Sequence, residues 1–116
     1  MVPSLRTLLK RILPPPALNA AKRARYSVLG HLYRNDLCRL AVALGTDKWN
    51  FHWYMQHYDR YFRPLRHRHL HVLEIGVGGY EHSAIGAGSL RAWKYYFPNS
   101  LIFGIDLHDK RALEER

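Results

Sequence analysis

The feature that most constrains this chain is an apolar run with a carboxylate near its end that passes directly into glycines, Val72–Gly79. A second apolar run that ends in a carboxylate, Leu101–Asp106, follows about twenty residues later. Short runs rich in branched aliphatic residues predict two buried parallel strands, and Leu90–Phe97 between them predicts the connecting helix. A glycine turn after one strand and an acid after the next are typical of one half of a nucleotide-binding α/β fold.

The length of the chain limits how much of such a fold it can hold. It has 116 residues, and each strand with its crossover takes about 30 residues or more. Two parallel strands alone leave faces and edges uncovered. We therefore expect the N-terminal part of a Rossmann-like fold, with helices before a β-loop-α-β unit and an incomplete sheet. We assign residues 1–44 to a basic helical segment with a proline-rich spacer, and residues 45–116 to the first part of a truncated cofactor-binding domain.

Positive charge is concentrated ahead of the first predicted strand. Residues 1–71 hold 13 Lys and Arg against 3 Asp and Glu, whereas residues 72–116 hold 5 against 6. This balance favours contact with anionic lipid or nucleic acid, although a solvated basic face has the same composition. No apolar run reaches the length of a membrane span, and basic residues interrupt any signal-peptide core. We therefore expect a cytoplasmic protein.

Helical periodicity dominates the N-terminal part. Residues 4–13 place leucines at helical spacing with basic residues between them, which predicts a short amphipathic helix that Pro14 ends. Residues 17–44 predict further helix, broken near Gly30 and stopped at Gly45. The first helix can lie on an anionic membrane, dock on its own domain or remain disordered.

Three other features each have a functional and a structural interpretation. Aromatic residues repeat at helical spacing through Phe51–Phe62, which favours a core stripe over a surface for base stacking. His67, His69 and His71 would share one face of an extended segment, but no acid accompanies them, so we predict no metal site. Cys38 is the single cysteine, and we expect a small buried thiol without reactivity.

The glycine turn predicts a ligand site through its backbone geometry. Gly76 permits a tight turn off the strand, and Gly78 or Gly79 allows backbone to approach a ligand without an intervening Cβ. Glu74, near the strand end, can bind an ammonium group or order the turn. These residues alone do not decide between the two roles of Glu74.

The acid that ends the second strand also has two interpretations. Asp106 can accept hydrogen bonds from ribose hydroxyls, or it can cap the end of its strand. It lies 30 residues after Gly76, and the usual spacing of about 20 implies an inserted loop over residues 80–88. Ser89 is predicted to cap the helix that follows this loop.

Three segments together resemble the class I S-adenosylmethionine-dependent methyltransferases: Leu73–Gly79, Gly88–Pro98 and Ile102–Asp106. More narrowly, they resemble the sugar O-methyltransferases of macrolide antibiotic biosynthesis, of the mycinamicin and demethylmacrocin type. The segment Gly45–Trp49, with the histidine and tyrosines that follow it, is similar to the segment before the first strand in that group. The resemblance runs from about Gly45 to Lys110, and the start of the helix, Gly-Ser-Leu-Arg-x-Trp-Lys, is its most specific part.

The resemblance implies S-adenosylmethionine as the cofactor and a hydroxyl of a sugar or polyketide-type glycoside as the acceptor. Glu74, Gly76 and Gly78 would line the methionine part of the cofactor, and Asp106 would hold its ribose. The resemblance also implies that Ser89 and Arg91, at the start of the helix, would close the site near the cofactor. The loop over the mouth of the site would consist of Thr46, Asp47 and Lys48.

In the macrolide enzymes, magnesium and a catalytic base help to activate the acceptor hydroxyl, and both depend on later strands that this chain lacks. The resemblance therefore leaves the catalytic residues unknown and assigns no magnesium ligand here. We expect the chain alone to be inactive.

Two rival functions remain. A nicotinamide or flavin oxidoreductase shares the glycine turn and the acid, but its G-x-G-x-x-G pattern is absent, since the glycines after Gly79 are Gly86 and Gly88. A basic module for anionic membrane or nucleic acid would use residues 1–71, but it gives no role to Asp106. We expect no specific nucleic-acid partner.

Overall fold

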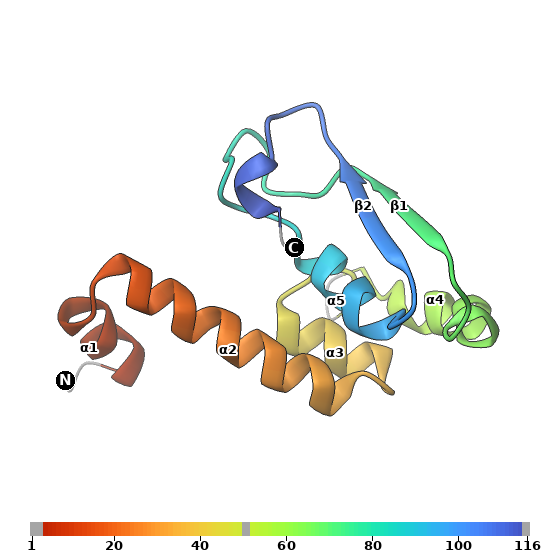
Figure 1. Cartoon of the computed structure of the whole chain (residues 1–116), viewed down its shortest axis with the longest axis horizontal. Coiled ribbons are helices and arrows are strands. Elements are labelled where there is room, and N and C mark those ends of the chain that lie inside the picture. The colour runs from red at the N-terminus through yellow and green to blue at the C-terminus, as the bar shows by residue number, and fades with distance from the viewer. Residues whose placement is uncertain (1–3, 50–51, 115–116) are drawn as a thin grey trace.

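The computed structural model describes residues 4–49 and 52–114, which form helices on one side of a parallel sheet (Figure 1). Along the chain the elements are α1 Leu5–Ile12, α2 Pro15–Tyr33, α3 Leu37–Leu44, α4 Met55–Phe62, β1 His71–Ile75, α5 Gly88–Tyr96 and β2 Leu101–Ile105, with 3-10 turns at Arg63–Leu65 and Arg111–Leu113. This order confirms the predicted α/β fold and its β-loop-α-β unit, with two strands within the described residues. No helix in these two ranges is both long and apolar enough to cross a membrane.

The prolines after α1 do not all lie in a spacer between helices, as we predicted. Helix α1 ends at Ile12, as expected, and Pro14 is extended, with φ −65° and ψ 154°. Pro15 and Pro16, however, already occupy the first turn of α2. Proline is tolerated there because amides of the first turn have no partner inside the helix. The connection between the two helices is therefore Leu13 and Pro14.

The predicted break near Gly30 is wrong, because α2 runs through this residue. Gly30 is buried against α5, where a Cβ would come within 2.5 Å of the Tyr95 ring. The glycine therefore permits close helix packing instead of a turn. The break follows α2 at Asp36, whose carboxylate accepts a hydrogen bond from the backbone N–H of Arg39 at 3.0 Å. Gly45, at φ +75°, ends α3 as predicted.

The hydrophobic core lies where α3, α5 and the start of α4 meet: Leu37, Leu40, Ala41, Leu44, Met55, Ala92, Trp93, Tyr96 and Phe97. Tyr58 and Phe62 of α4 pack edge-on against Trp93, with ring centroids 5.5 and 5.9 Å away. At these positions the aromatic stripe is a core stripe, as the periodicity favours. The helix itself begins at Met55; the predicted start at Phe51 lies outside the described residues.

The two strands pair in register from His71–Leu101 to Ile75–Ile105. Val72 and Ile102 are half-buried against the helical core. The opposite face carries exposed apolar side chains: Leu73, Ile75, Leu101, Phe103 and Ile105. Our prediction of buried strands is therefore wrong for this face, because one helical layer covers one face of a sheet only. An uncovered face is what an incomplete sheet produces.

The segments after the strands are irregular. Residues 76–87 form a loop, as the inserted-loop prediction requires. After Asp109 the chain forms a single 3-10 turn, Arg111–Leu113, and the Asp109 carboxylate accepts hydrogen bonds from the backbone amide and the guanidinium of Arg111. Residues 115 and 116 lie outside the described part.

Candidate functional site

The carboxyl ends of the strands bring the glycine turn and the second acid together. The backbone N–H of Gly76 donates to the carbonyl oxygen of Ile105 at 2.7 Å. The turn after β1 and Asp106 after β2 therefore begin side by side. This edge of a parallel sheet is where ligands bind in open α/β folds.

The glycines of the turn have two different roles. Gly76 and Gly78 have φ of +83° and +80°, and apart from their own chain neighbours no atom of the described residues lies within 4 Å of a Cβ built on either. Open space therefore faces their backbone on the side where a ligand can approach. Gly79 differs, because a Cβ there would collide with the carbonyl oxygen of Ile85. Of the two glycines that we considered for ligand approach, Gly78 has the free face and Gly79 packs on its own loop.

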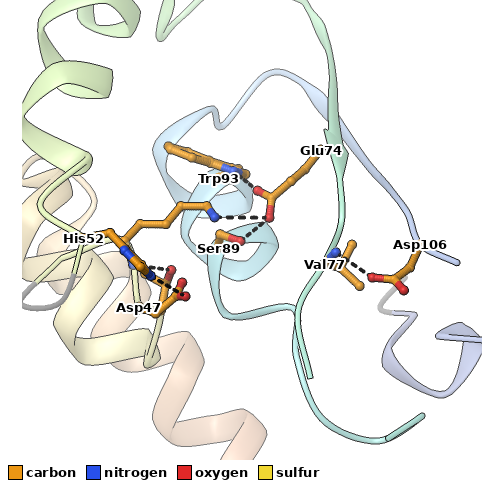
Figure 2. Close-up of polar contacts among 9 residues, drawn as sticks. Asp47, His52, Glu74, Val77, Ser89, Trp93 and Asp106 are labelled. Carbon is orange, nitrogen blue, oxygen red and sulfur yellow. Dashed lines mark hydrogen bonds and ion pairs between the residues drawn. The ribbon is translucent and has the colours of Figure 1, made fainter. Parts of the chain in front are cut away.

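The Glu74 carboxylate is held by three side chains, one from the α3–α4 loop and two from α5 (Figure 2). Its Oε1 accepts from the Ser89 hydroxyl and lies 3.8 Å from the Lys48 ammonium. Its Oε2 accepts from the Trp93 indole N–H at 2.7 Å. The side chain of Glu74 is 12% exposed and that of Lys48 is 22% exposed. The structure thus brings together three predicted site residues, Lys48, Glu74 and Ser89.

Ser89 has a different role from the predicted helix cap. Helix α5 begins at Gly88 after the left-handed Ala87, and its N-cap has no side-chain hydrogen bond. The Ser89 hydroxyl instead donates to Glu74 from inside the first turn. Trp93, the second hydrogen-bond partner of Glu74, was not predicted from the sequence. The available signal was its position four residues after Ser89, which puts both side chains on one face of the helix.

The loop after α3 holds the other predicted mouth residues. The Thr46 hydroxyl accepts from the backbone N–H of Lys48 at 3.3 Å. Asp47 Oδ2 lies 3.6 Å from His52 Nε2 (Figure 2). Thr46 therefore shapes the turn that presents Lys48 to Glu74. The Arg91 guanidinium lies 4.9 Å from the Tyr26 ring centroid on α2, and its Nη1 donates a hydrogen bond to the carbonyl oxygen of Gly86 at 3.4 Å.

Asp106 forms a second, separate group with backbone donors. Its Oδ2 accepts from the N–H of Val77 at 2.9 Å, and its Oδ1 accepts from the N–H of His108 at 3.0 Å (Figure 2). These bonds, first that from His108 and then that from Val77, lower the pKa of Asp106. The carboxylate is therefore ionised at neutral pH. It also lies at the border of an open cleft of about 660 Å³ along β2.

Hydrogen bonds connect the loop between β1 and α5 to the segment that follows β2. The Lys110 ammonium donates to the carbonyl oxygens of His82 and Ile85, at 2.7 and 3.1 Å. The loop between β1 and α5 is therefore fixed to the segment after β2.

Within the described residues, no group of three or more His, Cys, Asp or Glu side chains could hold a metal ion. Cys38 is half-buried, and burial raises the pKa of its thiol.

Sequence comparison finds sugar O-methyltransferases. The chain is 45% identical over 100 residues to demethylmacrocin O-methyltransferase of Streptomyces fradiae, which covers 84% of this chain and 25% of that enzyme. It is 49% identical over 81 residues to mycinamicin VI 2''-O-methyltransferase of Micromonospora griseorubida, which covers 69% of this chain and 20% of that enzyme. No protein-family model matches the chain.

Structure comparison finds the MycE methyltransferase of the mycinamycin biosynthetic pathway, solved in complex with Mg, SAH (S-adenosylhomocysteine) and mycinamycin VI. The TM-score is 0.66 at 49% identity, over 69% of this chain and 22% of that one. The chain thus spans about a quarter of the length of these relatives.

Proposed function

Because the chain is homologous to macrolide-sugar O-methyltransferases over about a quarter of their length, we propose that it forms the S-adenosylmethionine half-site of such an enzyme. The observation that carries this proposal is the placement of Glu74 and Asp106 around the open backbone of Gly76 and Gly78. The cofactor supplies the methyl group on its sulfonium, and the residues of this chain would bind and orient it.

Glu74 is suited to the ammonium of the methionine part. A carboxylate has about four acceptor positions, and hydrogen bonds from Ser89 and Trp93 occupy two of them. Acceptor positions therefore remain for a further donor. These two hydrogen bonds and the ion pair with Lys48 also fix the rotamer of Glu74, which lowers the entropy that a bound ammonium would otherwise cost.

Asp106 is suited to the two ribose hydroxyls. Each of its oxygens accepts one backbone hydrogen bond, from Val77 or from His108, and each retains a second lone pair. The lowered pKa keeps the group ionised, and an ionised acceptor gives the stronger hydrogen bond. The sequence left two alternative roles for Asp106, capping the end of its strand and accepting hydrogen bonds from ribose. The side chain can have both roles at once.

We further propose that the acceptor is a hydroxyl on a sugar of a glycoside. The relatives are named for macrolide and tetracenomycin glycosides, which supports this class. MycE was solved with Mg, whereas the described residues of this chain offer no three-residue metal cluster.

Isothermal titration of the chain with S-adenosylhomocysteine tests the half-site. We expect Asp106→Ala to weaken binding at least tenfold, because both ribose acceptors are lost. Asp109→Ala is the matched control: it removes an exposed acid three residues away that binds Arg111, and it should leave the Kd within twofold. Absence of binding by a wild-type chain that circular dichroism shows to be folded would contradict the proposal.

The N-terminal helix supports a second, independent function, contact with an anionic membrane. Residues 4–35 contain seven Lys and Arg and no Asp or Glu, and α1 exposes Leu5, Leu8 and Ile12. Basic charge beside exposed apolar side chains fits a lipid surface. Cosedimentation with phosphatidylserine vesicles should fall strongly in Leu8→Glu and remain in Val42→Glu, which alters an exposed apolar residue on α3.

A further inference from the structure

The loop between α3 and α4 presents three consecutive ring side chains to solvent. Trp53 is 50% exposed, Tyr54 is 47% exposed, and the side chain of His52 is 41% exposed. We call these three residues the aromatic platform. Its first member, His52, lies 3.6 Å from Asp47, which directly precedes Lys48 of the candidate cofactor site (Figure 2).

The platform is held in place by backbone and ring contacts. The N–H groups of Tyr54 and Met55 both donate to the carbonyl oxygen of Lys48, at 2.8 and 3.2 Å. The His52 ring stacks on Tyr54 with centroids 5.3 Å apart and planes 8° apart. The Trp53 ring meets Trp49 edge-on at 4.8 Å, and Trp49 packs against the core. A solvent-facing surface with this many contacts is preorganised for a ligand.

Trp53 is also in a strained backbone conformation. Its φ is +58°, in the left-handed region that a bulky side chain rarely adopts. Glycine or asparagine would occupy this position with less strain. Strain of this kind concentrates at ligand-binding sites, where the side chain is needed. The fold thus holds an exposed tryptophan at a position where its backbone conformation is unfavourable.

Two series of contacts connect the platform to Glu74. One passes from His52 through its contact with the Asp47 carboxylate to the neighbouring Lys48, which reaches Glu74 (Figure 2). The other passes through rings: Tyr54 meets Tyr58, Tyr58 meets Trp93, and the Trp93 indole donates to Glu74. The platform is therefore rigidly placed relative to the carboxylate that we assign to the cofactor.

We propose that the aromatic platform binds the sugar ring of the acceptor glycoside, an inference that rests on the proposed function. Aromatic faces carry negative charge and attract the polarised C–H groups on one face of a pyranose ring. The Asp47 carboxylate beside the platform is 67% exposed and can accept hydrogen bonds from sugar hydroxyls. The same charge repels phosphate, which disfavours nucleic acid as the occupant.

The test is saturation-transfer NMR of methyl α-L-rhamnopyranoside with the chain saturated in S-adenosylhomocysteine. The ring C–H and C6 methyl signals should show transfer with the wild type, and Trp53→Ala and Tyr54→Ala should each reduce it at least fivefold. Tyr61→Ala is the control, because Tyr61 is 67% exposed on α4 but outside the platform. Unchanged transfer in the two platform variants would overturn the proposal.

Trp53→Gly separates loss of the ring from loss of folding. It removes the same ring as Trp53→Ala but relieves the positive φ, so it should have the higher Tm while losing the glycoside signal equally. If the wild type binds S-adenosylhomocysteine but no glycoside, the platform proposal fails and the cofactor half-site stands. If a folded wild type binds neither, both proposals fail.

Discussion

The two carboxylates of the site are built in contrasting ways. Glu74 is nearly buried and is held by side chains from the α3–α4 loop and α5. Asp106 lies beyond the sheet edge and is held by two backbone amides from adjacent loops. Glu74 therefore depends on tertiary packing, while Asp106 depends on the local course of the backbone. Stability and ligand binding should respond differently to changes at the two positions.

The largest difference should come from removal of the acids themselves. Glu74→Ala leaves Lys48 and Trp93 donors without their partner in a nearly buried place, and should lower the free energy of unfolding by about 3 kcal/mol. Asp106→Ala should lower it much less, because Asp106 is held by backbone amides and the His108 end of this arrangement is exposed to water. Urea unfolding followed by circular dichroism measures both. Glu81→Ala, an exposed acid, is the control, and equal losses at Glu74 and Asp106 would contradict the contrast.

The glycine turn offers a second separation of stability from binding. Gly79→Ala should destabilise the fold by about 2 kcal/mol, since its Cβ would collide with the Ile85 carbonyl at positive φ. Gly78→Ala should cost about 1 kcal/mol, because only the backbone conformation opposes it. Titration with S-adenosylhomocysteine should nevertheless be weaker in Gly78→Ala, whose Cβ points into open space. Stronger destabilisation by Gly78→Ala would be incompatible with this loop geometry.

Trp93→Phe tests one donor to Glu74 with little change in packing. It keeps a large ring in the core but removes the indole N–H that lies 2.7 Å from Oε2. The loss of one hydrogen bond to a charged group should cost about 1–2 kcal/mol. Phe97→Leu, a core change that leaves Glu74 untouched, controls for the altered packing. In thermal unfolding, Trp93→Phe combined with Glu74→Gln should be less than additive, whereas full additivity would mean that the two side chains do not interact.

The smallest effect concerns acid pH and Asp106. Its pKa is lowered in the folded state by the His108 and Val77 amides. The resulting stability is complete above the unfolded pKa, about 3.9, and is lost as the pH falls through the lower folded value. Asp106→Asn should therefore show a flatter decline of unfolding free energy below about pH 4. A decline identical to the wild type would show that these two bonds do not favour the ionised group.

The contrast also explains what the sequence could predict. Backbone features were accessible: the strands, the turn at Gly76, the stop at Gly45 and the acid after β2 all follow from local residue patterns. The roles that depend on tertiary contacts could not be predicted from the sequence. Gly30 has the local signature of a break, and only its contact with Tyr95 shows that it serves helix packing.

Ser89 illustrates the same limit within the site. A serine before a helix predicts a cap, but the hydroxyl is drawn to Glu74, fifteen residues earlier in the chain. The partner became available only when β1 packed against α5. The strain at Trp53 was equally invisible, because φ depends on how the Lys48 carbonyl gathers the amides of Tyr54 and Met55. Sequence patterns therefore locate the site, and the fold assigns the partners.

One spectrum can test both halves of the site together. In a ¹H–¹⁵N NMR titration with S-adenosylhomocysteine, the Trp93 indole N–H reports on Glu74 and the Val77 amide reports on Asp106. We predict that both signals shift and that both fit the same Kd, because one ligand would contact both carboxylates. A folded chain in which neither signal moves, or only one does, would contradict the assignment of Glu74 and Asp106 to a single cofactor half-site.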